Sequence, residues 1–102
     1  MSNISEGRKA LVTRVLEGAG HASPVDRRAA FYLSGLAGPL AALTDKVAYD
    51  AASTSDQDIA AAKASGLTED QVFEIVICAA IGQAHRQYDT AFAALEAATG
   101  KE

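Results

Sequence analysis

The sequence predicts an all-α protein of about five helices. The chain is rich in alanine, its runs of β-branched residues are short, and no segment alternates polar and apolar residues as a half-buried strand does. Apolar residues recur instead at spacings of three and four, between glycines, prolines and helix-capping residues. A chain of 102 residues is expected to form a single helical domain, 1–102.

Two helices are predicted in the N-terminal part of the chain. In SEGRKALVTRVLEG the apolar residues follow helical spacing, and GAGHAS, which we expect to be mobile, ends the helix. A second helix is expected over 24–36. Ser23 is a suitable N-cap, Pro24 suits the first helical position, and Asp26 completes a capping signature. The Gly-Pro pair at 38–39 is expected to break this helix.

Two further helices are predicted in the middle of the chain. The segment PLAALTDKVAYDAA carries a narrow apolar stripe made of Leu40, Leu43, Val47 and Ala51. The segment STSDQDIAAAKASG predicts a short helix, in which Ser55 is the cap and Asp58 completes the capping signature. Gly66 is expected to end this helix in the left-handed conformation.

The last helix has the best start signal in the chain. Thr68 is the expected N-cap and Gln71 its capping-box partner, so a helix is predicted over 69–98, with a bend expected at Gly82. Its segment VFEIVICAAI is apolar all the way round except for Glu74. Such a helix must be covered on nearly every side. We therefore expect neighbouring subunits to supply part of the cover, which predicts a homo-oligomer.

Composition and charge limit the kinds of partner that we expect the protein to bind. The net charge is -4 and the nine Lys and Arg residues are scattered, so no nucleic-acid surface is expected. The start MSNISEGRK lacks the apolar core of a secretory signal, and no segment has the ~20 apolar residues of a membrane span. We expect a cytoplasmic protein with no membrane partner.

One cysteine makes no intrachain disulfide, and the acidic residues near helix starts have a structural role, so no metal and no cofactor are expected.

The order of these pieces resembles a known superfamily. The stretch TSDQDIAAAKASGLTEDQVFEIVICAAIGQAHRQYDTAFAALEAA, with the junction AKASGLTEDQVFEIV, is similar to the carboxymuconolactone decarboxylase and alkylhydroperoxidase D-like superfamily. The likeness covers about 36–98. It implies a helical bundle whose long last helix packs between subunits, in an oligomer of the trimer or hexamer type.

The redox motif of that superfamily is missing here. Peroxidase members carry Cys-x-x-Cys with a histidine four residues later and a glutamate further upstream. The corresponding positions in this sequence are Ala51, Thr54, Asp58 and Pro39. The resemblance therefore implies the fold and an oligomer more strongly than it implies the peroxide reductase or the lactone decarboxylase activity of the family. Classical Cys-x-x-Cys peroxidase activity is not expected.

The candidate catalytic residues are Glu74, Cys78 and His85, which share one stripe of the last helix with Tyr88. Cys78 and His85 are ~10 Å apart along the axis, too far for the direct hydrogen bond of a thiol and its base. Glu74, one turn before Cys78, is expected to raise the thiol pKa. The first interpretation is a buried, inert thiol. The second is a site completed by His85 of an antiparallel copy.

The two ligand-binding candidates are Tyr88, on this stripe, and Arg86, which follows His85 in the sequence. For Arg86 the alternative interpretation is an ion pair near Gln83 and Asp89. For His85 it is a hydrogen-bonded histidine at an interface, and His21 is interpreted as an exposed loop residue.

Three hypotheses about function follow. The first is a non-catalytic oligomeric subunit or small-molecule-binding protein of the alkylhydroperoxidase D-like type. The second is a diverged enzyme, of the peroxide reductase or lactone decarboxylase type, with an interface pocket around His85. There Tyr88, Arg86 or Glu74 would orient a small acidic substrate. The third is an accessory module that pairs with a longer relative through its apolar last helix.

Overall fold

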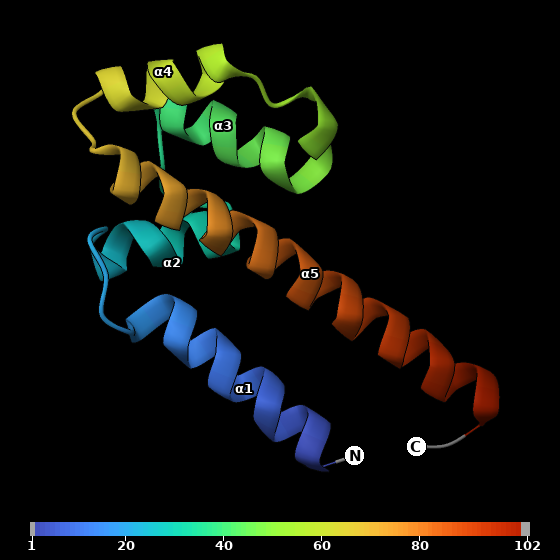
Figure 1. Cartoon of the computed structure of the whole chain (residues 1–102). Helices are drawn as coiled ribbons and strands as arrows, with labels where there is room; N and C mark the ends of the chain where they lie inside the picture. The colour runs from blue at the N-terminus through green and yellow to red at the C-terminus, as the bar shows by residue number, and fades with distance from the viewer. Residues whose placement is uncertain (1, 101–102) are drawn as a thin grey trace.

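The computed structural model describes residues 2–100, with side chains from residue 6 onward, and within this range its regular elements are helices joined by short linkers, with no strand (Figure 1). The elements in chain order are α1 (Ser2–Glu17), α2 (Pro24–Tyr32), α3 (Gly38–Tyr49), the 3-10 helix η1 (Ala51–Ser53), α4 (Asp56–Ala64) and α5 (Glu69–Thr99). The predicted all-α class is confirmed. The predicted domain 1–102 includes Met1, Lys101 and Glu102, which lie outside the described residues.

Of the three predicted capping signatures, two form complete capping boxes, at α4 and α5. At α2 the Ser23 hydroxyl accepts from the Asp26 amide at 3.0 Å, which confirms Ser23 as the N-cap. At α4 the Ser55 amide donates to the Asp58 carboxylate at 2.9 Å, and the Asp58 amide donates to the Ser55 hydroxyl at 3.3 Å. At α5 the same exchange joins Thr68 and Gln71, at 2.9 and 3.1 Å. Each box provides partners for amides that the first turn of a helix leaves free. Gly66 has the predicted positive φ, at 114°.

Helix α2 is shorter than predicted. It ends at Tyr32 rather than at residue 36, because Leu33 adopts the left-handed conformation with φ 54°. The Ser34 amide then donates back to the Ala29 carbonyl at 2.9 Å, which closes the helix end. Leu36 follows as part of the linker and packs against the core.

The start and end of α3 also differ from the prediction. The Gly-Pro pair at 38–39 opens α3, where a proline without an amide hydrogen is tolerated. Ala51, predicted on the apolar stripe of this helix, lies beyond its end in η1 and is exposed.

The core lies where α2, α3 and α4 pack against the N-terminal half of α5 (Figure 1). The side chains with the least exposure include Ala30, Phe31, Leu43, Ala62, Val72, Ile75 and Ala79. Within the described residues no helix is long and apolar enough to cross a membrane. We call this part of the molecule, with α5 up to Gly82, the body.

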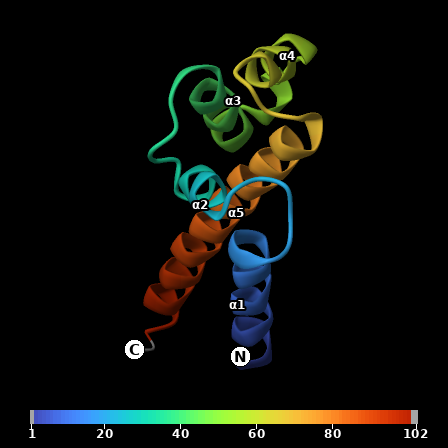
Figure 2. The same ribbon diagram turned by 90° about the vertical axis from the view of Figure 1, so that its left-hand side faces the viewer.

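Beyond Gly82, α5 leaves the body and runs beside α1. The first turns of α1 and the last turns of α5 lie at the same end of the molecule, away from α3 and α4 (Figures 1 and 2). We call α1 and the Gln83–Thr99 part of α5 the arm. The radius of gyration is 15.3 Å, whereas a compact domain of this length has about 13 Å. The arm accounts for the elongation.

Gly82 has a different role from the predicted bend. Helix α5 runs without interruption from Glu69 to Thr99. A Cβ atom at Gly82 would lie 2.1 Å from the carbonyl oxygen of Phe31, at the end of α2. Only glycine allows the two backbones to approach so closely. The residue fixes where α5 crosses α2.

Candidate functional site

The predicted stripe of Glu74, Cys78, His85 and Tyr88 faces α1 and the loop that joins α1 to α2. Each of these side chains contacts a residue from this N-terminal segment. The structure thus gives the stripe a common environment, in which Glu74 and Cys78 have separate partners and His85 and Tyr88 share Arg8.

Glu74 holds the loop between α1 and α2. Its carboxylate accepts hydrogen bonds from the amides of His21, at 2.9 and 2.8 Å, and Ala22, at 2.8 Å. These donors, the Ala22 amide first, lower the pKa of the Glu74 carboxyl, while desolvation opposes the shift. Gln71 adds a bond to the His21 carbonyl at 3.1 Å. The loop expected to be mobile is therefore anchored to the start of α5.

Cys78 is buried beneath α1. The side chain is 2 % exposed, and its thiol donates to the Val15 carbonyl at a sulfur–oxygen distance of 3.6 Å. Burial raises the pKa of the Cys78 thiol to about 11; the charge of Arg27 opposes this shift and that of Glu74 adds to it. Since the thiolate is the reactive form, the site keeps this cysteine in its unreactive form at neutral pH.

His85 belongs to a polar cluster in the arm. Its Nδ1 atom lies 2.9 Å from a guanidinium nitrogen of Arg8, and the same nitrogen donates to the Asp89 carboxylate at 2.8 Å. A guanidinium group can only donate, so Nδ1 must accept and carries no hydrogen. The ring hydrogen is then on Nε2, which lies 3.5 Å from Asp89.

Tyr88 lies under the same arginine. The Arg8 guanidinium carbon is 4.4 Å from the centre of the Tyr88 ring, and that ring stacks on Phe92 with centres 5.9 Å apart. Arg8 thus contacts three residues of α5, and it connects the N-terminal part of α1 to the second half of the long helix.

Arg86 points away from this stripe. It donates to the Phe31 carbonyl at 2.6 Å and, through two nitrogens, to Gln83 at 3.3 and 2.9 Å. The Phe31 carbonyl is near the end of α2, where helix carbonyls lack partners in the helix. Among the described residues Arg86 forms no ion pair with Asp89, which pairs with Arg8 instead. A solvated or interface ion pair of Arg86 stays a prediction. The two ligand-binding candidates therefore lie on different sides of α5.

Sequence reasoning missed a buried arginine. Arg27 is 6 % exposed and donates to the carbonyls of Gly18, at 2.7 Å, and Val15, at 3.3 Å. Both carbonyls follow or end α1, so Arg27 caps that helix. The sequence did carry a signal for the contacts of the neighbouring loop between α1 and α2. That signal is Glu74, because a lone carboxylate in an apolar run needs hydrogen-bond donors.

The positions that carry the redox motif in the resembled superfamily serve the local structure here. Asp58 accepts from Lys46 at 3.1 and 2.9 Å as well as from Ser55, and these contacts, Lys46 first, lower its carboxyl pKa. Ala51 is exposed in η1, and Thr54 follows η1 before α4 begins. Among the described residues, no three His, Cys, Asp and Glu side chains are grouped so that they could hold a metal ion.

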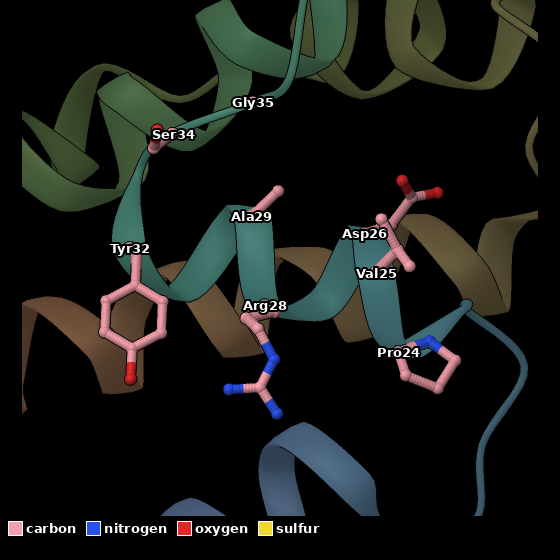
Figure 3. A pocket seen from close by; sticks show the side chains of 8 residues that line it. All are labelled: Pro24, Val25, Asp26, Arg28, Ala29, Tyr32, Ser34 and Gly35. Atoms are coloured by element: carbon pink, nitrogen blue, oxygen red, sulfur yellow. The ribbon is translucent and has the colours of Figure 1, made fainter.

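Three surface hollows are relevant. A crevice of about 210 Å³ lies between α1 and α5 and is lined by Leu11, Val12, Ile81 and Ala84, with Arg8, His85 and Tyr88. A smaller one of about 170 Å³ borders Cys78, Glu74 and Arg27. Figure 3 shows a third, of about 490 Å³, along α2 and the segment that follows it. It is open, and none of the predicted site residues lines it.

Comparison with known proteins gives no further assignment. No protein-family model matches the chain, and neither a curated protein nor a solved structure matches it.

Proposed function

We propose that the protein is a non-catalytic subunit that associates with copies of itself, of the alkylhydroperoxidase D-like type but without the redox motif. One observation supports the non-catalytic role, which is the first part of this proposal. Glu74, Cys78 and His85 are each bonded to a different part of the N-terminal segment, so the stripe holds α1 and its loop against α5.

The chemistry of the thiol supports a non-catalytic role. Cys78 is almost fully buried, and a thiol with a pKa of about 11 is overwhelmingly protonated at neutral pH. His85 is bonded to Arg8 rather than to the thiol, so the chain supplies no base for Cys78 from its own His85.

The exposed surface supports self-association. The chain exposes 6481 Å², whereas a compact monomer of 10.5 kDa exposes about 5400 Å². The surplus is close to the ~800 Å² that each partner contributes to a typical specific interface. Three of the exposed large side chains, Phe73, Ile77 and Leu95, belong to α5. The proposal includes a cytoplasmic location, which is expected from the sequence, and an oligomer of the trimer or hexamer type, which the resemblance implies.

A second candidate function rests on the crevice between α1 and α5. It is almost entirely apolar, and His85, Tyr88 and Arg8 lie at its polar side. This favours a small, largely apolar molecule over the small acidic substrate expected from the sequence, because Asp89 already faces Arg8. A diverged enzyme would use His85 here, so His85→Ala must abolish its activity while Gln87→Ala, at an exposed position on the same helix, leaves it.

The proposal is tested by combining an activity assay with a mass measurement. Peroxide reduction is followed with a dithiol reductant, for the natural protein and for Cys78→Ala, and the mass is obtained by light scattering. We expect equal background rates for the two proteins and a mass of several chains. A robust rate that disappears in Cys78→Ala would overturn the non-catalytic role, and a monomer at micromolar concentration would overturn the association.

A further inference from the structure

An apolar stripe runs along the side of α5 that faces away from the core. Its members are Phe73, Ile77, Ala80, Ala84, Ala91 and Leu95, and all six are exposed. They follow spacings of four, three and seven residues, as in the contact seam of paired helices. Ala84 is nine positions after the buried Ile75, which places it on the opposite side of the helix. The single chain leaves this whole side uncovered.

The crevice between α1 and α5 opens beside the same stripe. Ala84 belongs to both, and Ile81 and Leu11 extend the apolar surface from α5 to α1. The stripe and the crevice therefore form one continuous apolar surface, with a hollow of about 210 Å³ that a side chain of a neighbour can fill.

We propose that two copies of the chain pair through this stripe, with their α5 helices antiparallel and a twofold axis at Ala84. The inference rests on the proposed self-association and specifies its surface. Ala84 is midway between Phe73 and Leu95 and also midway between Ile77 and Ala91. An axis at this residue brings Phe73 opposite Leu95 and Ile77 opposite Ala91, whereas Ala80 lies opposite Tyr88. The small side chain of Ala84 allows the closest approach at the centre.

Charge supports the antiparallel direction. The first turn of α5 carries Glu69 and Asp70. A parallel pair would bring four carboxylates and two helix N-termini together, whereas the antiparallel pair sets the two helix dipoles in opposite directions. The last turn of α5 carries no basic side chain, so the dipoles support this direction and ion pairs do not. The surplus surface of about 1000 Å² derived above is sufficient for one such interface.

Disulfide trapping tests the pairing. In a Cys78→Ala background, Ala84→Cys is oxidised with diamide, and Ala93→Cys serves as control because residue 93 is an exposed alanine on the other side of α5. A residue on a twofold axis meets its own copy, and a disulfide requires Cα atoms within about 7 Å. We expect most of the Ala84→Cys chains to form covalent dimers and at least fivefold fewer of the Ala93→Cys chains.

A mixture of Ile77→Cys and Ala91→Cys chains tests the direction. The antiparallel pair predicts a disulfide between the two variants and little between two Ala91→Cys chains. Efficient self-linking of Ala91→Cys would mean a parallel pair and would overturn the proposal.

Sedimentation of the natural protein separates this inference from the proposed function. An oligomer that does not link through Ala84→Cys, or a cyclic trimer, which has no twofold axis, would overturn this pairing and leave self-association in place. A monomer would overturn both. As a non-covalent check, Ile77→Glu is expected to weaken association at least tenfold, whereas Val25→Glu, at a 76 % exposed position on α2, is expected to leave it unchanged.

Discussion

The two halves of α5 are stabilised in different ways. In the body, its residues Val72, Ile75 and Ala79 are buried against α2, α3 and α4. In the arm, the same helix is held by polar and aromatic contacts to Arg8 and by the bonds of Arg86, one of them to the Phe31 carbonyl of α2, and most of its surface is exposed. The comparison teaches that burial of one side fixes the half of α5 in the body, whereas a few polar and aromatic contacts hold the half in the arm, and exposed apolar side chains run along both halves.

The largest expected effect is at the crossing of α5 and α2. Gly82→Ala would place a methyl group 2.1 Å from the Phe31 carbonyl, so the helices must separate. We expect a loss of about 3 kcal/mol in the free energy of unfolding, since overpacking a tight contact costs roughly 1–3 kcal/mol or more. Denaturant unfolding of the variant measures this loss.

Gly7→Ala in the arm is the matched control. A Cβ atom there meets no atom within 4 Å. Alanine favours a helix over glycine by up to about 1 kcal/mol, so this variant is expected to be unchanged or slightly more stable. If both glycines tolerate alanine equally, the body and the arm do not differ in packing as described.

The second largest loss of stability is expected where the arm joins the body. Glu74→Gln removes the charge that accepts from the His21 and Ala22 amides, and we expect a loss of about 1–2 kcal/mol. Glu69→Gln, which replaces an exposed glutamate one turn earlier, is expected to change stability by less than about 0.5 kcal/mol. Equal losses in the two variants would contradict the anchoring of the loop.

The same contact predicts a dependence on pH. Because the pKa of Glu74 is lower in the folded chain than its ordinary value of 4.5, the unfolded chain binds more protons between the two values. The contribution of Glu74 is complete above pH 4.5 and is lost as the pH falls through the lowered pKa. The difference in unfolding free energy between the natural protein and Glu74→Gln should therefore shrink below pH 4.5. A constant difference would mean that the charge contributes nothing.

The smallest effect is expected in the arm. Arg8→Ala removes the contacts to His85, Asp89 and Tyr88, which are partly exposed. We expect a loss of less than about 1 kcal/mol, as for other exposed ion pairs and cation–π contacts. Hydrogen exchange should show faster exchange in the 83–99 part of α5 and little change in the body. A global loss as large as that of Gly82→Ala would contradict the separation into two parts.

Local signals in the sequence predicted much of the fold. The capping boxes at Ser55 and Thr68 involve residues three apart, so their contacts are set within one turn of chain. The end of α2 could not be predicted in this way. It depends on Leu33 taking a left-handed conformation while α5 packs against the Phe31 carbonyl, and these segments are far apart in the sequence.

For the candidate site, the sequence predicted only that its residues lie together on one side of the last helix. Helical periodicity placed Glu74, Cys78 and His85 on one side of α5. It could not show that the N-terminal segment covers this side, because α1 carries weak pattern signals and its contacts come from residues more than 50 positions away. The interpretation of Cys78 as a buried thiol agrees with the structure, whereas the roles of His85 and Tyr88 in binding or catalysis remain predictions.

The most direct test of the account is the reactivity of Cys78 toward an aromatic disulfide reagent as a function of pH, in native and in denatured protein. We expect the denatured thiol to react at once, with an inflection near the ~8.5 of free cysteine. The native thiol should react only as fast as the chain opens, with no inflection near neutrality, because burial raises its pKa to about 11. Fast reaction of the native protein at neutral pH would show that Cys78 is accessible and activated, and would contradict the non-catalytic role.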